Sequence, residues 1–372
     1  MSLREKIERE IRERGPIPFS RYMELCLYDP ELGYYARRAG QFGKAGDFYT
    51  ASDVHAVFGR LLARQFEEMW RALGSPTATE ILELGPGRGL FALDVLDWSE
   101  KKFPEFFTAV RYRLCESSPA LRQKLQHTLA RHFESGKCDF AEAGHVSSLR
   151  PQIIFANEFF DALPVEVIGS KGKLQIDIQN GRLVECWTTP SAEELEYLDR
   201  FSVHPEPGER VEVPLSAQDH MRRAIHSLQR GFIVVVDYGY TRQELLAGRH
   251  RGTIMAYRQH SASPNAYEAP GDQDITAHVN FSALAAIAEQ NGMKVEKLLT
   301  QSQFLMGIGE GNQFADAFED SKLPQERAKV ALQLKHLVTP AGMGETFHVL
   351  LAGKGVSSHA VDQLSGIKFG RS

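Results

Sequence analysis

The chain has 372 residues, of which 42% are hydrophobic and 24% charged, and its formal net charge is -5. This composition is typical of a globular protein with a sizeable core, and it excludes wholesale disorder and a globally basic, DNA-binding surface. The four cysteines form no Cys-x-x-Cys pair, so a zinc ribbon and a thioredoxin-type redox site are unsupported. We expect reduced thiols and a cytoplasmic location.

Neither a membrane span nor a targeting segment is expected. The longest apolar runs, such as residues 232–236, are strand-sized and too short to cross a bilayer. The first 14 residues mix arginines with as many glutamates, whereas transit peptides contain few acidic residues. We therefore predict no membrane insertion.

Residues 1–75 predict a helical cap that contributes to the site described below. Leu3, Ile7 and Ile11 follow a helical spacing, and residues 15–46 are dense in Pro, Gly and Tyr. A longer helix with one apolar face is expected after Ser52, which is typical of an N-cap.

From Thr79 the chain alternates between apolar strands and helices. Strands are expected at residues 81–84, 112–115, 153–156, 232–236, 295–299 and 347–351. Repeated strand–helix–strand units imply a parallel sheet covered by helices. The predicted fold class is α/β, with a Rossmann-like core of residues 76–164 and 231–355.

Two segments interrupt or follow this core. Between residues 165 and 230, an Asn180-Gly181 pair flanked by apolar residues predicts a hairpin with a tight primed turn. We expect residues 165–230 to form an inserted hairpin and helix subdomain. Residues 356–372 are polar, which predicts a flexible tail.

The glycine-rich turn after the first core strand indicates a cofactor site. It contains Gly85, Pro86, Gly87 and Gly89, and glycines allow a ligand to approach the backbone closely. A dinucleotide fingerprint would need glycine where Leu90 stands, so an NAD-linked oxidoreductase is disfavoured, and no P-loop pattern is present. A turn without any ligand is the simpler alternative.

Two acidic residues favour S-adenosylmethionine as the ligand. Glu83, two residues before the first glycine, suits a cationic sulfonium and an α-amino group better than a pyrophosphate. Glu116 follows the second strand, where a carboxylate can accept both ribose hydroxyls.

The sequence resembles the MidA-like family of class I methyltransferases over roughly residues 15–354. The motifs that carry the resemblance are Tyr28-Asp-Pro-Glu-Leu-Gly-Tyr-Tyr35, Gly46-Asp-Phe-Tyr-Thr50, Phe58-Gly59, Glu83-Leu-Gly-Pro-Gly-Arg-Gly89, Asn157-Glu-Phe-Phe-Asp-Ala-Leu-Pro164, Asp237-Tyr-Gly-Tyr240 and Asp274-Ile-Thr-Ala-His278. The resemblance implies a mostly parallel seven-stranded sheet, S-adenosylmethionine as cofactor and a bacterial member of the family. Mitochondrial relatives assist assembly of respiratory complex I and are thought to methylate an arginine of one of its subunits.

The loop from Asn157 to Asp161, which follows the strand at residues 153–156, is the predicted catalytic segment, because in methyltransferases the loop after this strand lies beside the transferred methyl group. Glu158 and Asp161 suit the N–H fork of a guanidinium, and either carboxylate can take a proton from it. The alternative is that Asp161 caps the next turn and the two intervening phenylalanines are core residues. Asn157 is expected to contact the cofactor.

Three further residues have two interpretations each. Asp47 and Thr50 either close over the cofactor or cap a helix, and His278 is either a base or a structural residue. No metal is expected, because no ligand spacing such as His-Glu-x-x-His occurs.

The sequence leaves three functions open. Protein arginine N-methylation is the first, and an RNA or small-molecule substrate for the same enzyme class is the second. The third is a non-catalytic assembly chaperone with a cofactor-binding core. The oligomeric state is not predicted.

Overall fold

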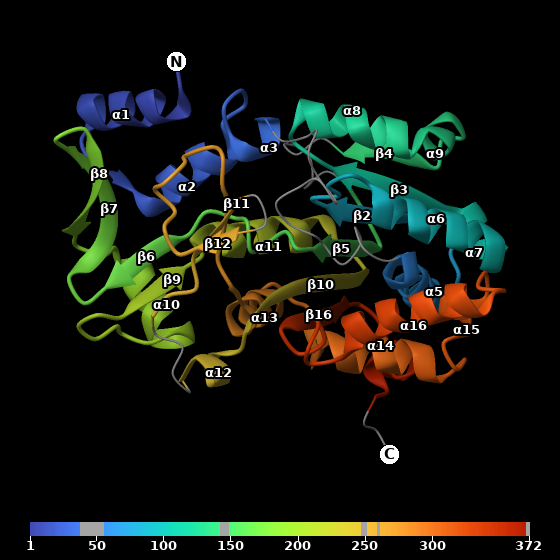
Figure 1. The fold of residues 1–372 in the computed structure, drawn as a ribbon. Coiled ribbons are helices and arrows are strands. Elements are labelled where there is room, and N and C mark those ends of the chain that lie inside the picture. The colour runs from blue at the N-terminus through green and yellow to red at the C-terminus, as the bar shows by residue number, and fades with distance from the viewer. Residues whose placement is uncertain (38–55, 142–148, 247–250, 259–260, 370–372) are drawn as a thin grey trace. The chain divides into compact units, whose positions relative to one another are not determined.

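The computed structural model describes residues 1–37, 56–141, 149–246, 251–258 and 261–369 (Figure 1). It contains two compact units. Unit 1 comprises residues 1–48, 160–220 and 239–284, and unit 2 comprises residues 49–159, 221–238 and 285–372. In the part of the chain that is described, no helix combines the length and the apolar character that a bilayer crossing requires.

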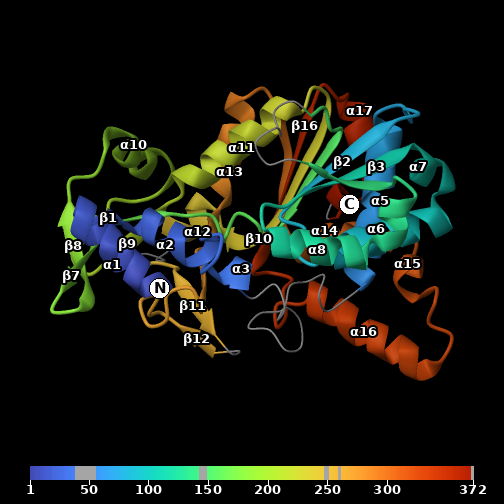
Figure 2. The same cartoon turned by 90° about the horizontal axis from the view of Figure 1, so that it is seen from above.

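A seven-stranded sheet forms the centre of unit 2 (Figure 2). Its order is β15 (Lys294–Thr300), β16 (Phe347–Lys354), β10 (Gly231–Tyr240), β5 (Ile153–Asn157), β2 (Thr79–Leu84), β3 (Val110–Cys115) and β4 (Cys138–Ala141). All neighbours from β4 to β10 run parallel, and β16 is antiparallel to β10 and to β15. The prediction of a mostly parallel α/β sheet is confirmed.

The helices of unit 2 follow the predicted alternation with the strands. They are α5 (Ala56–Ala72), α6 (Leu90–Lys102), α7 (Pro104–Ala109), α8 (Pro119–Thr128), α9 (Ala130–Glu134), α14 (Gln301–Glu310), α15 (Ala315–Phe318), α16 (Pro324–Val338) and α17 (Ser358–Val361), with a final 3-10 turn at Ser365–Ile367. Two more helices, α11 (Leu215–Ser227) and α13 (Phe281–Gln290), belong partly to each unit.

Helix α5 differs from its predicted place in an N-terminal cap, because it packs within unit 2. An added Cβ at Gly59 would lie 2.5 Å from the Asp94 Cβ of α6, so the two helices approach closely. The Phe66 ring meets the rings of Phe91 and Phe155 edge-on, at centroid distances of 6.2 and 5.5 Å. The long apolar face of α5 is therefore part of the hydrophobic core of unit 2.

Unit 1 joins the N-terminal segment and the predicted insertion into one body. It contains the helices α1 (Leu3–Arg14), α2 (Phe19–Tyr28), α3 (Tyr34–Arg37), α10 (Ala192–Phe201) and α12 (Arg242–Leu246). One sheet consists of β1 (Ile17–Pro18), β6 (Glu166–Gly169), β7 (Gly172–Gln179), β8 (Arg182–Thr188) and β9 (Arg210–Val213). A second sheet consists of β11 (Met255–Arg258), β12 (Ser261–Ser263) and β13 (Asp274–Thr276), and the short strand β14 (Val279–Asn280) pairs with the end of β10.

Strand pairing explains why two segments predicted to be separate share a core. Ile17 of β1 lies opposite Ile176 of β7, and both side chains are buried. Helix α1 lies beside β7 and β8 in both views, and Arg4 donates a hydrogen bond of 2.9 Å to the Gly181 carbonyl (Figures 1 and 2). The predicted hairpin is confirmed: Asn180 and Gly181, with φ of 51° and 71°, form its primed turn.

The C-terminal segment also differs from its predicted flexibility. In its described part, residues 356–369, the side chains of Val361, Leu364 and Ile367 are buried in the core of unit 2. Although this segment is polar overall, it contains three apolar residues at spacings of three, and all three reach the core.

This burial gives a stability prediction. Leu364→Ala should destabilise the protein by about 2–5 kcal/mol, because it leaves a cavity in the core of unit 2. Leu332→Ala is the matched control, since Leu332 is 68% exposed on α16, and its effect should stay within about 0.5 kcal/mol. Urea unfolding would measure both, and equal midpoints for the two variants would show that the segment does not contribute to the core.

Candidate functional site

The glycine turn joins β2 to α6 in unit 2. Gly85, Gly87 and Gly89 all have positive φ, at 65°, 54° and 78°, which side chains rarely adopt. The Gly85 amide donates to the Cys115 carbonyl at 3.1 Å, and the Gly89 amide donates to the Pro86 carbonyl at 2.9 Å. The turn therefore has one well-defined conformation, and it ends where α6 begins.

The three glycines have different surroundings. A Cβ at Gly85 would lie 2.7 Å from the Phe159 ring, and a Cβ at Gly89 would lie 2.7 Å from Leu125 of α8. At Gly87, no atom of the described residues comes within 4 Å of the added Cβ. Gly85 and Gly89 are thus required by packing inside the protein, whereas Gly87 leaves backbone open to a ligand.

Glu83 lies beneath this turn and is almost fully buried. The Tyr112 hydroxyl of β3 donates a hydrogen bond of 3.0 Å to Glu83 Oε2. Loss of hydration raises the pKa of Glu83 to about 8, and the Tyr112 hydrogen bond only partly opposes this shift. In the protein alone at neutral pH, the protonated form of Glu83 is therefore favoured.

Glu116 follows β3 at the same edge of the sheet as the glycine turn. Its Oε1 accepts a hydrogen bond of 2.7 Å from the Ser118 amide, and Ser118 in turn caps α8. Burial raises the pKa of Glu116, while the hydrogen bonds from the Ser118 and Ser117 amides lower it. These amides hold the carboxylate in a fixed orientation at the carboxyl end of the strand, where open α/β sheets bind ligands.

The loop after β5 lies against the glycine turn through the Phe159–Gly85 contact. Asn157 Nδ2 donates to Glu158 Oε1 at 3.1 Å, and the Glu158 amide donates to the Val236 carbonyl at 3.0 Å. Glu158 has a φ of 49°, an uncommon value for a residue with a side chain. Such backbone strain is frequent at ligand sites.

Asp237 of β10 holds this loop in place. It is fully buried, and its Oδ2 and Oδ1 accept hydrogen bonds from the Phe159 and Tyr238 amides at 3.2 and 2.9 Å. From the sequence, Asp237 is interpretable as a substrate contact or a turn former. The structure shows a third role, in which it ties the ends of two neighbouring parallel strands together.

The structure brings most of the predicted site residues together in unit 2: Glu83, Gly85, Pro86, Gly87, Gly89, Glu116, Asn157 and Glu158. Asp161 and His278 belong to unit 1. Asp47 and Thr50 lie outside the described residues. Tyr112 is not predicted from the sequence as the partner of Glu83. Tyr112 lies opposite Ile81 in the neighbouring strand, and Glu83, two residues further on, shares that face of the sheet.

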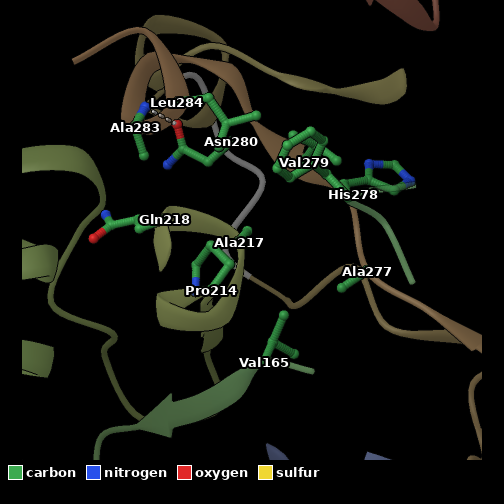
Figure 3. Close-up of a pocket in the computed structure, with 11 residues that line it drawn as sticks. Val165, Pro214, Ala217, Gln218, Ala277, His278, Val279, Asn280, Ala283 and Leu284 are labelled. Carbon is green, nitrogen blue, oxygen red and sulfur yellow. Dashed lines mark hydrogen bonds between the residues drawn. The ribbon is translucent and has the colours of Figure 1, made fainter. Parts of the chain in front are cut away.

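His278 lies in a mostly apolar setting in unit 1. It lines a small pocket and is drawn at its margin in Figure 3, where the other lining residues are Phe160, Val165, Pro214, Ala217, Gln218, Ala277, Val279, Asn280, Ala283 and Leu284. The His278 amide donates to Thr253 Oγ1 at 3.0 Å, and the Thr253 amide donates to Glu212 Oε1 at 2.7 Å. These contacts hold the segment after β13 through the backbone at position 278, so they do not depend on the histidine side chain.

Within the described ranges, no group of three His, Cys, Asp or Glu side chains could hold a metal ion. The four cysteines form no disulfide. The chemistry available in unit 2 is therefore that of a glycine turn, several carboxylates and an aromatic ring.

Comparison with known proteins identifies the family. A family model described as "Putative S-adenosyl-L-methionine-dependent methyltransferase" matches residues 61–299. The mitochondrial protein arginine methyltransferase NDUFAF7 homolog of Drosophila melanogaster is 29% identical over 99% of this chain and 88% of its own length. Its Homo sapiens relative is 28% identical over 91% and 80%.

Solved structures agree with this assignment. A Burkholderia thailandensis protein bound to S-adenosyl-homocysteine is 26% identical, has a TM-score of 0.82, and aligns over 97% of this chain and 94% of its own. A native crystal structure from the same organism, 27% identical with a TM-score of 0.81, aligns over 100% and 94%. The open backbone at Gly87 and the carboxylates at the strand ends fit S-adenosylmethionine. The chain belongs to this family of S-adenosylmethionine-dependent methyltransferases, with a class I fold.

Proposed function

We propose that the protein transfers a methyl group from S-adenosylmethionine to an arginine side chain of a protein. The contact between Phe159 and Gly85 carries the proposal, because it brings the carboxylate-bearing loop after β5 to the cofactor turn. The names of relatives that align over most of this chain support arginine as the acceptor. The resemblance to the MidA-like family suggests a subunit of a complex I-type enzyme as the substrate protein.

The proposed cofactor site uses the residues of unit 2. Gly87 leaves space for the ligand. Glu116 is proposed to accept hydrogen bonds from the ribose hydroxyls, and Glu83 is proposed to supply a carboxyl group beneath the turn. Pro86 and Asn157 are the other two residues of this unit that are proposed to contact the cofactor. Asp47 and Thr50 are proposed to contact the cofactor from the N-terminal segment.

The acceptor chemistry needs a group that takes a proton. S-adenosylmethionine, when bound, supplies a methyl group on a positively charged sulfur. A guanidinium has a high pKa, so the nitrogen that receives the methyl must give a proton to a nearby base as its new bond forms. Glu158 and Asp161 are the proposed acceptors of that proton, and His278 is a weaker candidate because its neighbours are mostly apolar.

A labelling experiment tests the acceptor. Purified protein is incubated with methyl-labelled S-adenosylmethionine and a cell extract that lacks the endogenous protein. We expect label that protease releases, RNase leaves intact, and acid hydrolysis recovers as methylarginine. Label in RNA or in small molecules would instead assign another substrate to the enzyme, and absence of any label would favour an assembly chaperone.

Cofactor binding should depend on Gly87. Gly87→Val places a branched side chain in the open space of the turn, so the affinity for S-adenosylmethionine should fall from micromolar to millimolar or weaker, a loss of about 4 kcal/mol. Calorimetric titration would measure this loss.

Gly136→Val is the matched control for backbone strain. Gly136 also has a positive φ, of 70°, and no described neighbour within 4 Å of an added Cβ, but it precedes β4 at the amino end of the strands. Both variants should lose similar stability, and only Gly87→Val should lose cofactor binding. Equal affinities in the two variants would contradict the proposed site.

Cofactor affinity should also depend on pH through Glu83. The raised pKa of about 8 means that Glu83 is mainly protonated below that pH. A bound sulfonium cation favours the ionised form, so binding releases a proton and affinity rises from pH 6 to 8, by up to about tenfold per pH unit. Calorimetry in buffers of different ionisation enthalpy would detect the proton, and Glu83→Gln should abolish both the release and the slope. If the wild-type affinity does not depend on pH, Glu83 does not interact with the sulfonium cation of the bound cofactor.

A further inference from the structure

Unit 1 contains a polar and aromatic group that the cofactor site does not use. It consists of Tyr28 at the end of α2, Tyr35 in α3, Asp161 in the loop after β5, Tyr257 in β11 and Asp274 in β13. We call it the carboxylate–tyrosine cluster. Three separate motifs of the sequence supply Tyr28, Tyr35, Asp161 and Asp274, and Tyr257 lies outside them. Of the five residues, only Asp161 is predicted from the sequence to contact a substrate.

Asp274 lies at the centre of the contacts in this cluster. The Tyr35 hydroxyl donates a hydrogen bond of 3.2 Å to Asp274 Oδ1. Tyr257 is directly opposite Asp274 in the antiparallel ladder of β11 and β13, so both side chains project from the same face of the small sheet. Asp274 thus has one tyrosine bonded to it and a second beside it.

Asp161 is fixed to the same region by its backbone. The Ala277 amide, three residues after Asp274, donates a hydrogen bond of 2.9 Å to the Asp161 carbonyl. The Tyr28 hydroxyl donates at 3.0 Å to the carbonyl of Ala162, the next residue. The centroids of the Tyr28 and Tyr35 rings are 5.4 Å apart, so the two rings are in contact. This contact links the residues around Asp161 to those around Asp274.

The charges of the two aspartates act on the same phenols. Burial is the largest cause that raises the pKa values of Tyr35 and Tyr257, and the negative charges of both Asp161 and Asp274 raise them further. Asp161 and Asp274 are 5% and 8% exposed, whereas the three tyrosines are only half-buried. The cluster therefore combines deep carboxylates with more accessible aromatic rings.

We propose that the carboxylate–tyrosine cluster binds the guanidinium group of the arginine to be methylated, a proposal that rests on the function proposed above. A guanidinium is planar and cationic, donates hydrogen bonds to carboxylates in a fork, and stacks on aromatic faces. Asp161 and Asp274 supply the acceptors, and Tyr35 and Tyr257 supply the aromatic rings. The proposal pairs Asp161 with Asp274, a carboxylate of its own unit, rather than with Glu158 of unit 2.

The first test uses the full chain and needs no variant. Nα-acetyl-L-arginine N-methylamide is titrated into the protein and its binding is followed by ligand-observed NMR. The matching citrulline amide has the same shape without the charge, and the lysine amide has the charge without the fork. We expect the arginine probe to bind at least about tenfold more tightly than either control, as for the loss of one charged hydrogen bond. Equal or tighter binding of either control, or no binding of the arginine probe, would overturn the proposal.

The second test uses variants matched in charge. Asp274→Asn and Asp161→Asn should each weaken binding of the arginine probe about tenfold. Asp272→Asn is the control: Asp272 lies two residues from Asp274, is 43% exposed, and pairs with Arg37 at 2.9 Å. It should leave the affinity for the probe within about twofold, because exposed ion pairs contribute little. Equal probe affinities in all three variants would overturn the proposal.

Two further readouts separate this proposal from the proposed function. S-adenosylmethionine affinity should be unchanged in all three variants, because Asp161, Asp272 and Asp274 are not among the residues proposed to hold the cofactor. If the wild type methylates protein arginine while the two cluster variants retain full probe binding and full activity, the function stands and the arginine site is elsewhere. If the wild type binds the arginine probe as expected but labels no protein, the methyltransferase function on arginine fails and the binding site stands.

Discussion

The contact between Gly85 and Phe159 is the constraint on which the site in unit 2 depends. A side chain at position 85 would overlap the Phe159 ring, so the glycine turn and the loop after β5 can meet only because residue 85 lacks one. Asp237 holds the other side of that loop through the Phe159 amide. Two loops that are separated by more than 60 residues are thereby fixed against each other at the carboxyl ends of β2 and β5.

Buried carboxylates make this arrangement electrostatically costly, and the structure satisfies each of them differently. Asp237 accepts hydrogen bonds from two backbone amides, those of Phe159 and Tyr238. Glu116 also accepts backbone amides, although burial still raises its pKa. Glu83 has one phenol as its described partner, and burial dominates its pKa. A cationic ligand can therefore change the protonation state of Glu83, the carboxyl group nearest the glycine turn in sequence.

Unit 1 shows how the family fold acquires a second body. The N-terminal segment supplies apolar side chains from α1 and α2, and the strands after residue 165 supply the face of a sheet on which they pack. Pairing of β1 with β7 and packing of α1 and α2 join them into a single core. The same packing brings tyrosines from the N-terminal segment to aspartates that lie more than 120 residues further along the chain.

The sequence by itself determined the features that depend on local pattern. Alternating apolar strands and helices specify the parallel sheet, Asn180-Gly181 specifies a primed turn, and the spaced glycines with Glu83 and Glu116 specify the cofactor class, because each is decided by backbone conformation or by neighbouring residues. Only the tertiary structure decided which segments share a core, because packing between distant segments leaves no local signal. It placed α5 and the C-terminal turns in unit 2, gave Asp237 its role as a tie between two strands, and brought Asp274 and Tyr35 together.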